Sequence, residues 1–268
     1  MSKLTALKAL LKEFPGAVIG FSGGVDSTFL ARVAREVLQD NVLAVTAVSD
    51  TYPEHQLTEA RQIAGQLGLN LEIINTNEFN CADFVSNPPE RCYHCKKELF
   101  LELKNFADQR GWVVLDGANL DDCSDFRPGH KAAAEFGVRS PLKEVGLTKA
   151  EIRELSKELG LPTWNKPAYA CLASRIPYGT QITAEALHRI DQAETFLTSL
   201  GFQQIRVRDH FPVARIEIGG TELPDAWQKR AAIAEKLHEI GFPYVTLDLD
   251  GFRSGSMNEI LKMREVRE

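Results

Sequence analysis

A short run of glycine and hydroxyl residues has the composition of a phosphate-binding loop. It reads Phe21-Ser-Gly-Gly-Val-Asp-Ser-Thr28 and separates a stretch typical of a buried strand from one typical of a helix. Two glycines let the backbone approach an anion closely, and successive N–H groups at a helix N-terminus favour negative charge. The residues expected to bind phosphate are Ser22, Gly23, Gly24, Asp26, Ser27 and Thr28.

The aspartate of this run suggests a role beyond the turn itself. Asp26 could ligate a Mg²⁺ ion that shares the phosphate oxygens, whereas the alternative is an ordinary turn in which Asp26 or Ser27 caps the helix. No Gly-Lys-Ser/Thr follows the glycines, which excludes a Walker A loop. The run resembles the pyrophosphate loop of the N-type ATP pyrophosphatases. That resemblance implies cleavage of ATP between its α- and β-phosphates, with AMP passed to a substrate oxygen.

Cysteines form the second chemically telling group. Cys92 and Cys95 make a C-x-x-C unit ahead of a predicted helix, and Cys171 lies far downstream. Three thiolates can hold three irons of a 4Fe–4S cluster. For a single C-x-x-C, zinc, redox and purely structural roles together would normally outweigh a cluster, although zinc would need a fourth ligand and His94 is poorly placed to share a metal with its neighbours. The two remaining cysteines are expected to be small buried hydrophobes: Cys81 and Cys123.

Alternating strand and helix patterns in the first half must position these residues. Apolar runs predict strands, and apolar residues at helical spacing predict helices. Their order is typical of an α/β fold with a doubly wound parallel sheet and helices on both faces. The predicted strands are 17–21, 42–48, 71–74 and 112–116; the predicted helices are 27–37, 53–67 and 96–109, with a polar loop over 78–90.

The second half follows a different order. A capping box, Thr148-Lys-Ala-Glu151, predicts a helix to residue 159, and regular periodicity lapses between 164 and 178. We therefore expect two domains, with the phosphate loop in residues 1–170 and a smaller α+β domain in residues 171–268. The later predicted helices are 183–200 and 226–240, and the later predicted strands are 204–208, 214–218 and 244–248.

Composition narrows the class of protein. The 268 residues are 44% hydrophobic and carry a formal net charge of −6, which argues against a protein whose main task is to hold nucleic acid. No apolar run is long enough to cross a bilayer, and the N-terminus reads as an amphipathic helix, not a signal peptide. Five cysteines in this length favour a reducing, cytoplasmic location.

Further motifs occur in the same order as in the LarE family. They follow the phosphate loop and the cysteine pair through the rest of the chain: Gly117-Ala-Asn-Leu-Asp-Asp122, Asp125-Phe-Arg-Pro-Gly129, Cys171-Leu-Ala-Ser-Arg175, Arg206-Val-Arg-Asp-His210, Ala214-Arg-Ile-Glu217 and Gly251-Phe-Arg-Ser-Gly-Ser-Met-Asn258. The chain is therefore similar to LarE proteins, pyridinium-3,5-biscarboxylic acid mononucleotide sulfurtransferases that help to build the nickel-pincer cofactor.

This resemblance implies an activity and its cofactors. The family activates a pyridinium carboxylate with ATP and Mg²⁺ and then inserts sulfur to give a thiocarboxylate. Some members give up the sulfur of a cysteine that corresponds to Cys171, whereas others carry three cysteines and use a 4Fe–4S cluster as sulfur carrier. Cys92, Cys95 and Cys171 match the three-cysteine pattern, with sulfide or another sulfur donor as the source. Asp26, Cys171 and Ser174 are the expected catalytic residues.

The resemblance also implies substrate-binding residues. Arg206 and Arg208 lie on one face of a predicted strand and would bind phosphate or carboxylate groups as planar donors; without the family match they read as solvent-facing arginines. Arg175 would help Ser174 to orient the activated carboxylate. Further candidates for lining the site are Glu194, Glu217 and Asp225, each with the alternative of a surface carboxylate. Candidates for Mg²⁺ or substrate at a strand's carboxyl end are Asn119, Asp121, Asp122 and Asp125.

Partners and rival functions follow from the same pattern. The resemblance implies a homo-oligomer, with a hexamer among the candidate assemblies, and a small-molecule substrate without nucleic acid. A tRNA thiolase would need a large basic surface or an RNA-binding module. An ammonia-using adenylating synthetase would have no use for three cysteines. A nucleotide-sensing module would keep the loop without catalysis.

Overall fold

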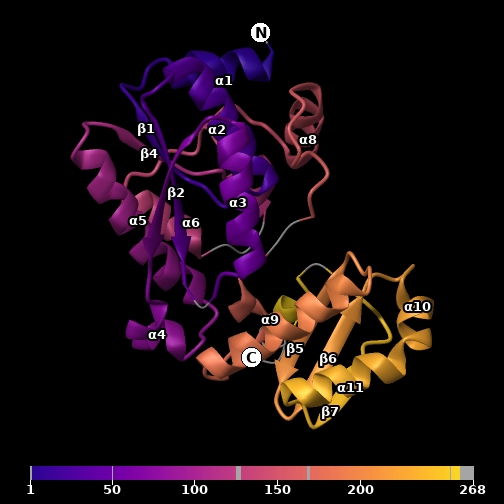
Figure 1. Ribbon diagram of the computed structural model, residues 1–268. Helices are drawn as coiled ribbons and strands as arrows, with labels where there is room; N and C mark the ends of the chain where they lie inside the picture. Colours follow the sequence, from indigo (N-terminus) through magenta and orange to yellow (C-terminus); the bar gives the residue numbers. More distant parts are fainter. Residues whose placement is uncertain (1, 50, 125–127, 168–169, 254, 260–268) are drawn as a thin grey trace. The chain divides into compact units, whose positions relative to one another are not determined.

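The chain forms two compact units (Figure 1). The structure is a computed structural model that describes residues 2–49, 51–124, 128–167, 170–253 and 255–259. Unit 1 comprises Met1–Phe84 and Pro89–Tyr169, and unit 2 comprises Val85–Pro88 and Ala170–Glu268. Among the described residues, no helix combines the length and the apolar character needed to cross a membrane.

A four-stranded parallel sheet forms the centre of unit 1. Its strands are β1 (Ala17–Gly20), β2 (Val42–Val48), β3 (Asn70–Asn75) and β4 (Val113–Leu115), in the order β3-β2-β1-β4. The chain moves outward from β1 to β3 and then returns to the other side of β1. The carboxyl ends of β1 and β4 therefore form a topological switch point, where open α/β sheets bind their ligands.

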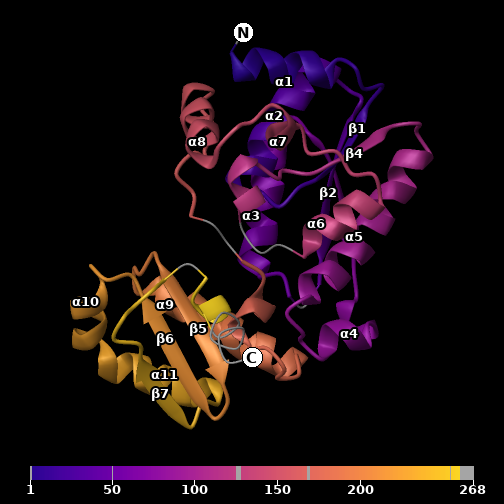
Figure 2. The ribbon, with the colours of Figure 1, turned by 180° about the vertical axis from the view of Figure 1, so that it is seen from behind.

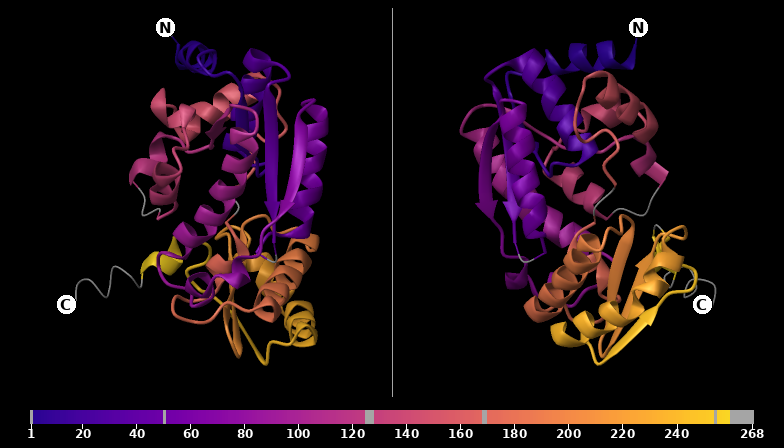
Figure 3. Two further views of the ribbon diagram at one scale, coloured as in Figure 1. Left: turned by 90° about the vertical axis from the view of Figure 1, so that its left-hand side faces the viewer. Right: turned by 45° about the vertical axis from the view of Figure 1, so that its right-hand side comes forward.

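Helices cover both faces of this sheet, as the views in Figures 1, 2 and 3 show from different sides. Ile19 of β1 packs against α2 and α3, while its neighbour Val18 packs against α5 and α6, because successive strand residues point to opposite faces. The helical segments up to residue 158 are α1 (Lys3–Leu11), α2 (Val25–Leu38), α3 (Glu54–Gln66), η1 (Glu78–Asn80), α4 (Ala82–Val85), α5 (Arg91–Asp108), η2 (Leu120–Ser124), α6 (Gly129–Glu135), α7 (Pro141–Glu144) and α8 (Lys149–Glu158).

Unit 2 is built on a smaller, mixed sheet. Strand β5 (Ile205–His210) pairs antiparallel with β6 (Val213–Ile218), and β6 pairs parallel with β7 (Tyr244–Leu247). Val207 and Ile216 pack on one face of the sheet with apolar residues of α9 and α11. The remaining helical segments are η3 (Leu172–Arg175), α9 (Ala184–Ser199), α10 (Leu223–Gln228), α11 (Arg230–Ile240) and η4 (Ser256–Asn258).

The α/β class, with its parallel sheet between helices and a separate small sheet, is confirmed. The capping box is confirmed too, since Thr148 accepts the N–H of Glu151 and Glu151 accepts the N–H of Thr148. The loop predicted over 78–90 is wrong, because η1 and α4 form there around the buried Phe84. The helix predicted over 226–240 is also wrong: it is two helices, separated at Lys229.

One short segment of the first half groups with unit 2. Asn87 is fully buried, and its side-chain amide donates to the carbonyls of Ile176, Pro177 and Thr180 at 2.8–3.3 Å. The N–H of Gly179 donates back to the Asn87 carbonyl at 2.9 Å. These bonds hold residues 85–88 against the segment that follows Cys171. No local sequence pattern predicts this arrangement.

Candidate functional site

The phosphate loop joins β1 to α2 at the switch point. Helix α2 begins at Val25, and its N-cap is Gly24, a residue without a side chain that could cap the first turn. Asp26 and Ser27 lie inside the first turn of the helix, so the alternative in which one of them caps an ordinary turn is wrong. The first N–H groups of α2 are thus left for a ligand, as an anion-binding helix N-terminus requires.

Hydroxyl groups line this loop from within. Ser22 Oγ lies 3.2 Å from Ser27 Oγ and accepts the N–H of Gly24 at 3.3 Å, and Ser27 Oγ donates to the Gly24 carbonyl at 3.3 Å. Ser22 is exposed, whereas Thr28 is fully buried and its hydroxyl has no hydrogen-bond partner among the described residues. Ser22 is therefore the hydroxyl best placed to meet an incoming phosphate.

Gly23 can be no other residue without a change of the loop. Its φ of +66° lies in the left-handed region, and an added Cβ would stand 3.1 Å from Ala60 Cα of α3. Both the conformation and the space therefore require glycine. The loop backbone is held directly against α3.

The segment after β4 also reaches the phosphate loop, from the other side of β1. A Cβ on Gly117 would lie 3.1 Å from the Ser27 nitrogen, so the two backbones approach closely. Asn119 Nδ2 contacts Asp26 Oδ1 at 3.4 Å. Asp122 Oδ2 accepts the N–H of Asn119 at 2.9 Å.

The remaining acidic candidates are placed differently. Asp121 Oδ2 accepts the N–H of Lys149 at 2.8 Å, so this carboxylate holds the start of α8 against the segment after β4. Asp125 lies outside the described residues. Asn119 is thus the predicted residue of this segment for which the structure gives a contact with the loop.

Two lysines meet the phosphate loop, and sequence reasoning missed both. Lys149 Nζ forms a close ion pair with Asp26 Oδ2. Lys166 is almost wholly buried, with Nζ 2.9 Å from the Gly23 carbonyl and 2.7 Å from Glu59. Lys149 is the first residue after the N-cap of α8, a position that the capping box identifies. Lys166 lies within the aperiodic stretch, which offered no signal.

Tyr52, which lies just before α3, supports the phosphate loop. Its hydroxyl donates to the Ser22 carbonyl at 3.1 Å. Burial, with a smaller effect of the nearby Glu59 carboxylate, raises the pKa of Tyr52 to about 12. The phenol therefore remains a proton donor to the loop across the physiological range.

The C-x-x-C pair lies inside a helix, and not ahead of one as predicted. Helix α5 begins at Arg91, so Cys92 and Cys95 share a face at a spacing of three residues. Cys92 is exposed; Cys95 is half-buried and its Sγ lies 3.7 Å from Glu78 Oε1. The expectation that Cys81 is buried is wrong, since it is partly exposed. The side chain of Cys123 lies outside the described part of the chain.

Cys171 belongs to unit 2 and stands exposed at the start of η3. The buried guanidinium of Arg175 holds the backbone around it. Arg175 Nη1 donates to the carbonyls of Ala170 and Cys171 at 2.6 and 3.1 Å and to Ser174 Oγ at 3.0 Å. Its other nitrogens bind both carboxylate oxygens of Glu194 at 2.7 and 2.9 Å. Arg175 therefore positions Cys171 and Ser174.

A layer of charge covers the face of the small sheet opposite α9 and α11. Arg206 and Arg208 alternate with the apolar residues of β5 and so share this face, as predicted from their spacing. Arg208 is buried, pairs with Glu217 at 2.6 Å and donates to the Ser174 carbonyl at 3.1 Å and Ser256 Oγ at 2.9 Å. Reading Arg208 as a solvent-facing arginine is therefore wrong.

Positive charge is concentrated on this face. Burial, reinforced by the charge of Arg175, lowers the pKa of Arg206 to about 10, so Arg206 stays charged at neutral pH. Burial and the charges of Arg215 and Arg208 lower the pKa of His210, which therefore stays neutral. Among the described residues, Nε of Arg208, Nε of Arg215 and Nε2 of His210 are buried without hydrogen-bond partners. Two of these atoms, Nε of Arg208 and Nε of Arg215, are donors without an acceptor among the described residues.

The three predicted carboxylates differ in position. Glu194 binds Arg175 and accepts the N–H of Val207 at 2.9 Å, and Glu217 is wholly buried between Arg208 and Arg215. The surface alternative is wrong for both. Asp225 exposes 52% of its side chain on α10 and pairs with Lys229 at 2.7 Å.

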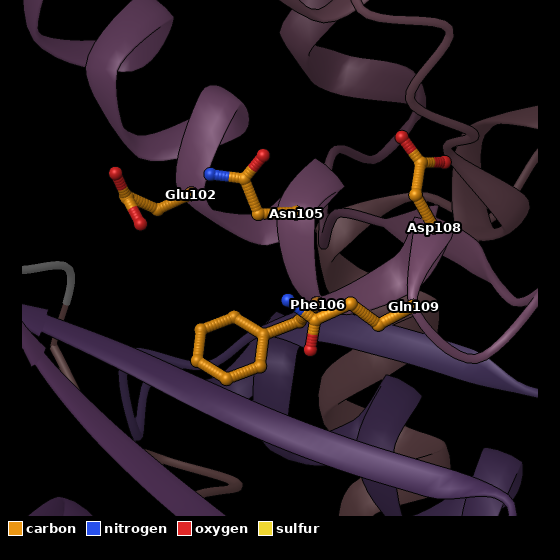
Figure 4. A pocket seen from close by; sticks show the side chains of 5 residues that line it. All are labelled: Glu102, Asn105, Phe106, Asp108 and Gln109. Atoms are coloured by element: carbon orange, nitrogen blue, oxygen red, sulfur yellow. The ribbon is translucent and has the colours of Figure 1, made fainter.

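A shallow depression on α5 lies apart from these groups (Figure 4). Its lining side chains come from the last turns of α5 and from Gln109, the C-cap of that helix. None of its lining residues belongs to the phosphate loop, the cysteine pair or the charged face: they are Glu102, Asn105, Phe106, Asp108 and Gln109. It offers no arrangement of donors that could do chemistry.

Known proteins resemble the chain over its whole length. The pyridinium-3,5-bisthiocarboxylic acid mononucleotide synthase of Lactiplantibacillus plantarum is 39% identical over 267 residues, covering 99% of this chain and 97% of that protein. An uncharacterized protein of Synechocystis is 44% identical over 97% of this chain and 98% of its own length.

Some similarities cover only part of the chain. A family model described as NAD synthase matches residues 5–97. An NH(3)-dependent NAD(+) synthetase of Finegoldia magna is 30% identical over 55% of this chain and 61% of its own length. The full-length match decides between these similarities: the chain belongs to the family of the pyridinium-3,5-bisthiocarboxylic acid mononucleotide synthase.

Proposed function

We propose that the chain uses ATP to convert the carboxylates of pyridinium-3,5-biscarboxylic acid mononucleotide into thiocarboxylates for the nickel-pincer cofactor. The observation that carries the ATP-dependent step is the uncapped helix N-terminus at the switch point, surrounded by Asp26, Lys149 and Lys166. The substrate is proposed from the similarity to the Lactiplantibacillus synthase. As a member of that family, the chain is an enzyme.

In the first step, a carboxylate oxygen of the substrate attacks the α-phosphorus of ATP. The bond from that phosphorus to the bridging oxygen of the β-phosphate breaks, and pyrophosphate leaves with the electron pair. The N–H groups of the loop, Lys149 and Lys166 would stabilise the growing charge on pyrophosphate. Asp26 offers the hard oxygen donor that suits Mg²⁺, whose charge would be shared with the phosphate oxygens.

In the second step, a sulfur nucleophile attacks the activated acyl carbon. The carbon–oxygen bond to AMP breaks, and AMP leaves with the original carboxylate oxygen. Arg175 fixes the segment that carries Cys171 and Ser174, so its role in this step is to position them. Each carboxylate requires one ATP and one sulfur atom.

We predict that Asp26→Asn lowers substrate-dependent pyrophosphate release by on the order of 10²-fold, because the carboxylate that would hold Mg²⁺ against the reacting phosphates is lost. The measurement is pyrophosphate release with and without the pyridinium mononucleotide. Asp40→Asn is a matched control: this carboxylate lies at the other end of α2 and pairs with Arg35 on the surface. An unchanged melting temperature would show that both variants fold. Equal release by both variants would contradict the assignment of the loop.

For unit 2, we propose that Arg206 binds an anionic group of the substrate while Arg208 and Glu217 hold the surrounding face. The unpartnered nitrogens of Arg208, Arg215 and His210 support an acceptor-rich ligand on this side of the sheet. Arg208 is a poor probe of this idea, since breaking a buried ion pair costs about 3–5 kcal/mol of stability. Arg206, which is only partly buried, is the better probe.

We predict that Arg206→Gln weakens binding of the pyridinium mononucleotide by about 10- to 100-fold, the loss expected for one hydrogen bond to a charged group. Titration calorimetry should show ATP affinity unchanged. Arg230→Gln, an exposed arginine at the start of α11, serves as the control. Weaker ATP binding with substrate binding intact would mean that Arg206 serves the other ligand.

We also propose that Cys92, Cys95 and Cys171 hold a 4Fe–4S cluster. Cys92 and Cys171 are exposed, and Cys92 and Cys95 lie on one face of α5. Three thiolates fit this cluster and leave one iron without a protein ligand, at which an exchangeable sulfide can be carried. The alternative is that Cys171 gives up its own sulfur and becomes dehydroalanine after a single turnover.

The two sulfur sources predict different activities for the cysteine variants. With a cluster, alanine at any of the three cysteines should remove iron and stop sulfur transfer while pyrophosphate release continues, and the wild type should turn over repeatedly with added sulfide. With a sacrificial Cys171, Cys92→Ala and Cys95→Ala should still complete one turnover. Anaerobic iron analysis and the intact mass of the protein decide. Loss of H₂S from Cys171 in iron-free protein would contradict the cluster.

The rival functions account for less of the chain. The NAD synthase model covers the loop but ends at residue 97, so it does not favour an ammonia-using synthetase over the full-length relative. A tRNA thiolase fits poorly with a net charge of −6. We further propose a cytoplasmic homo-oligomer that receives sulfide or another sulfur donor and binds no nucleic acid.

A further inference from the structure

We infer that unit 1 carries a second metal site, formed by Cys81, Asp83 and His94 and distinct from the thiolates of Cys92 and Cys95. One ligand atom from each of the three residues lies within 4.8 Å of the other two. Sulfur, imidazole nitrogen and carboxylate oxygen together are a donor set typical of Zn²⁺. The site goes beyond the proposed sulfur transfer and does not depend on it.

The chain builds this site by packing a short segment against α5. The Cys81 N–H donates to the Glu78 carbonyl at 3.0 Å, which sets the turn between η1 and α4, and the buried Phe84 anchors the segment. Two contacts fasten it to α5: the N–H of Asn77 donates to Glu98 Oε1 at 3.0 Å, and Cys95 Sγ lies 3.7 Å from Glu78. The backbone that carries Cys81 and Asp83 is thus held in place before any ion binds.

The direction of His94 separates this site from Cys92. On an α-helix each residue turns by about 100°, so His94 lies roughly 200° around α5 from Cys92. Its Nδ1 stands 3.9 Å from Asp83 Oδ2. His94 therefore meets the 81–83 segment and cannot share an ion with Cys92.

The spacing of the donors suits a tetrahedral ion after a small adjustment. Bonds of about 2.0–2.3 Å to zinc place neighbouring ligand atoms roughly 3.3–3.8 Å apart. Asp83 exposes 76% of its side chain and has the freedom to close the remaining gap. Three protein ligands leave the fourth position to water or another small donor. A bound ion would cross-link the 81–83 segment to the helix that carries Cys92 and Cys95.

The test uses iron-free, full-length protein with Co²⁺ as an optical stand-in for Zn²⁺. We expect one equivalent of Co²⁺ to bind with a thiolate-to-metal absorption band that Zn²⁺ displaces. Cys81→Ser should abolish the band, and His94→Ala or Asp83→Asn should weaken binding at least 10-fold. Zn²⁺ should also raise the melting temperature of the wild type and not that of Cys81→Ser.

Matched controls keep the two metal sites apart. Cys92→Ser should retain both the band and the rise in melting temperature. A metal-free melting temperature equal to that of the wild type would show that Cys81→Ser folds. The inference is overturned if the band is absent from the wild type, survives Cys81→Ser, or is lost in Cys92→Ser. Since neither ATP nor the pyridinium substrate is present, none of these results bears on the adenylation.

Discussion

The close approach of the Gly23 backbone to α3 is the constraint on which the nucleotide side of the molecule depends. With φ at +66° and Ala60 Cα at 3.1 Å from where a side chain would begin, position 23 favours glycine. The N-cap of α2 is Gly24, and Lys166 contacts the Gly23 carbonyl. Gly117, which follows β4, also approaches the loop closely, because a side chain at this position would crowd the Ser27 nitrogen.

Unit 2 depends on buried charge in a comparable way. Glu217 is wholly buried between two arginines. The Glu194 carboxylate accepts hydrogen bonds from Nε and Nη2 of Arg175 and from one backbone N–H. Ion pairs of this kind contribute little net stability, because the charges lose their water. Their effect here is geometric: Arg175 holds the backbone of Cys171, and Arg208 links β5 to Ser174 and Ser256.

Local patterns made much of this visible in the sequence. The strand–helix alternation, the capping box of α8 and the shared face of Arg206 and Arg208 all follow from the periods of strands and helices. Contacts between distant residues did not show in the same way. Lys149 pairs with Asp26, and Asn87 donates a hydrogen bond to Thr180. Both pairs are far apart in the sequence, and no residue spacing predicts them.

The other differences between prediction and structure have separate causes. Arg208 lies under Ser174 and Ser256, segments whose position a strand pattern does not reveal. The early start of α5 was missed because polar residues around the cysteines hide its helical period. Cys81 was read as buried because no partner stands near it in sequence, whereas in the structure it lies beside Asp83 and His94.

The fate of one oxygen atom shows whether a substrate carboxylate is activated by transfer of AMP. The substrate is prepared with ¹⁸O in its carboxylates and incubated with ATP, Mg²⁺ and a sulfur source. Because AMP departs with the carboxylate oxygen, we expect one ¹⁸O in each AMP formed and none in pyrophosphate. AMP without the label, or label in a released phosphate, would contradict it.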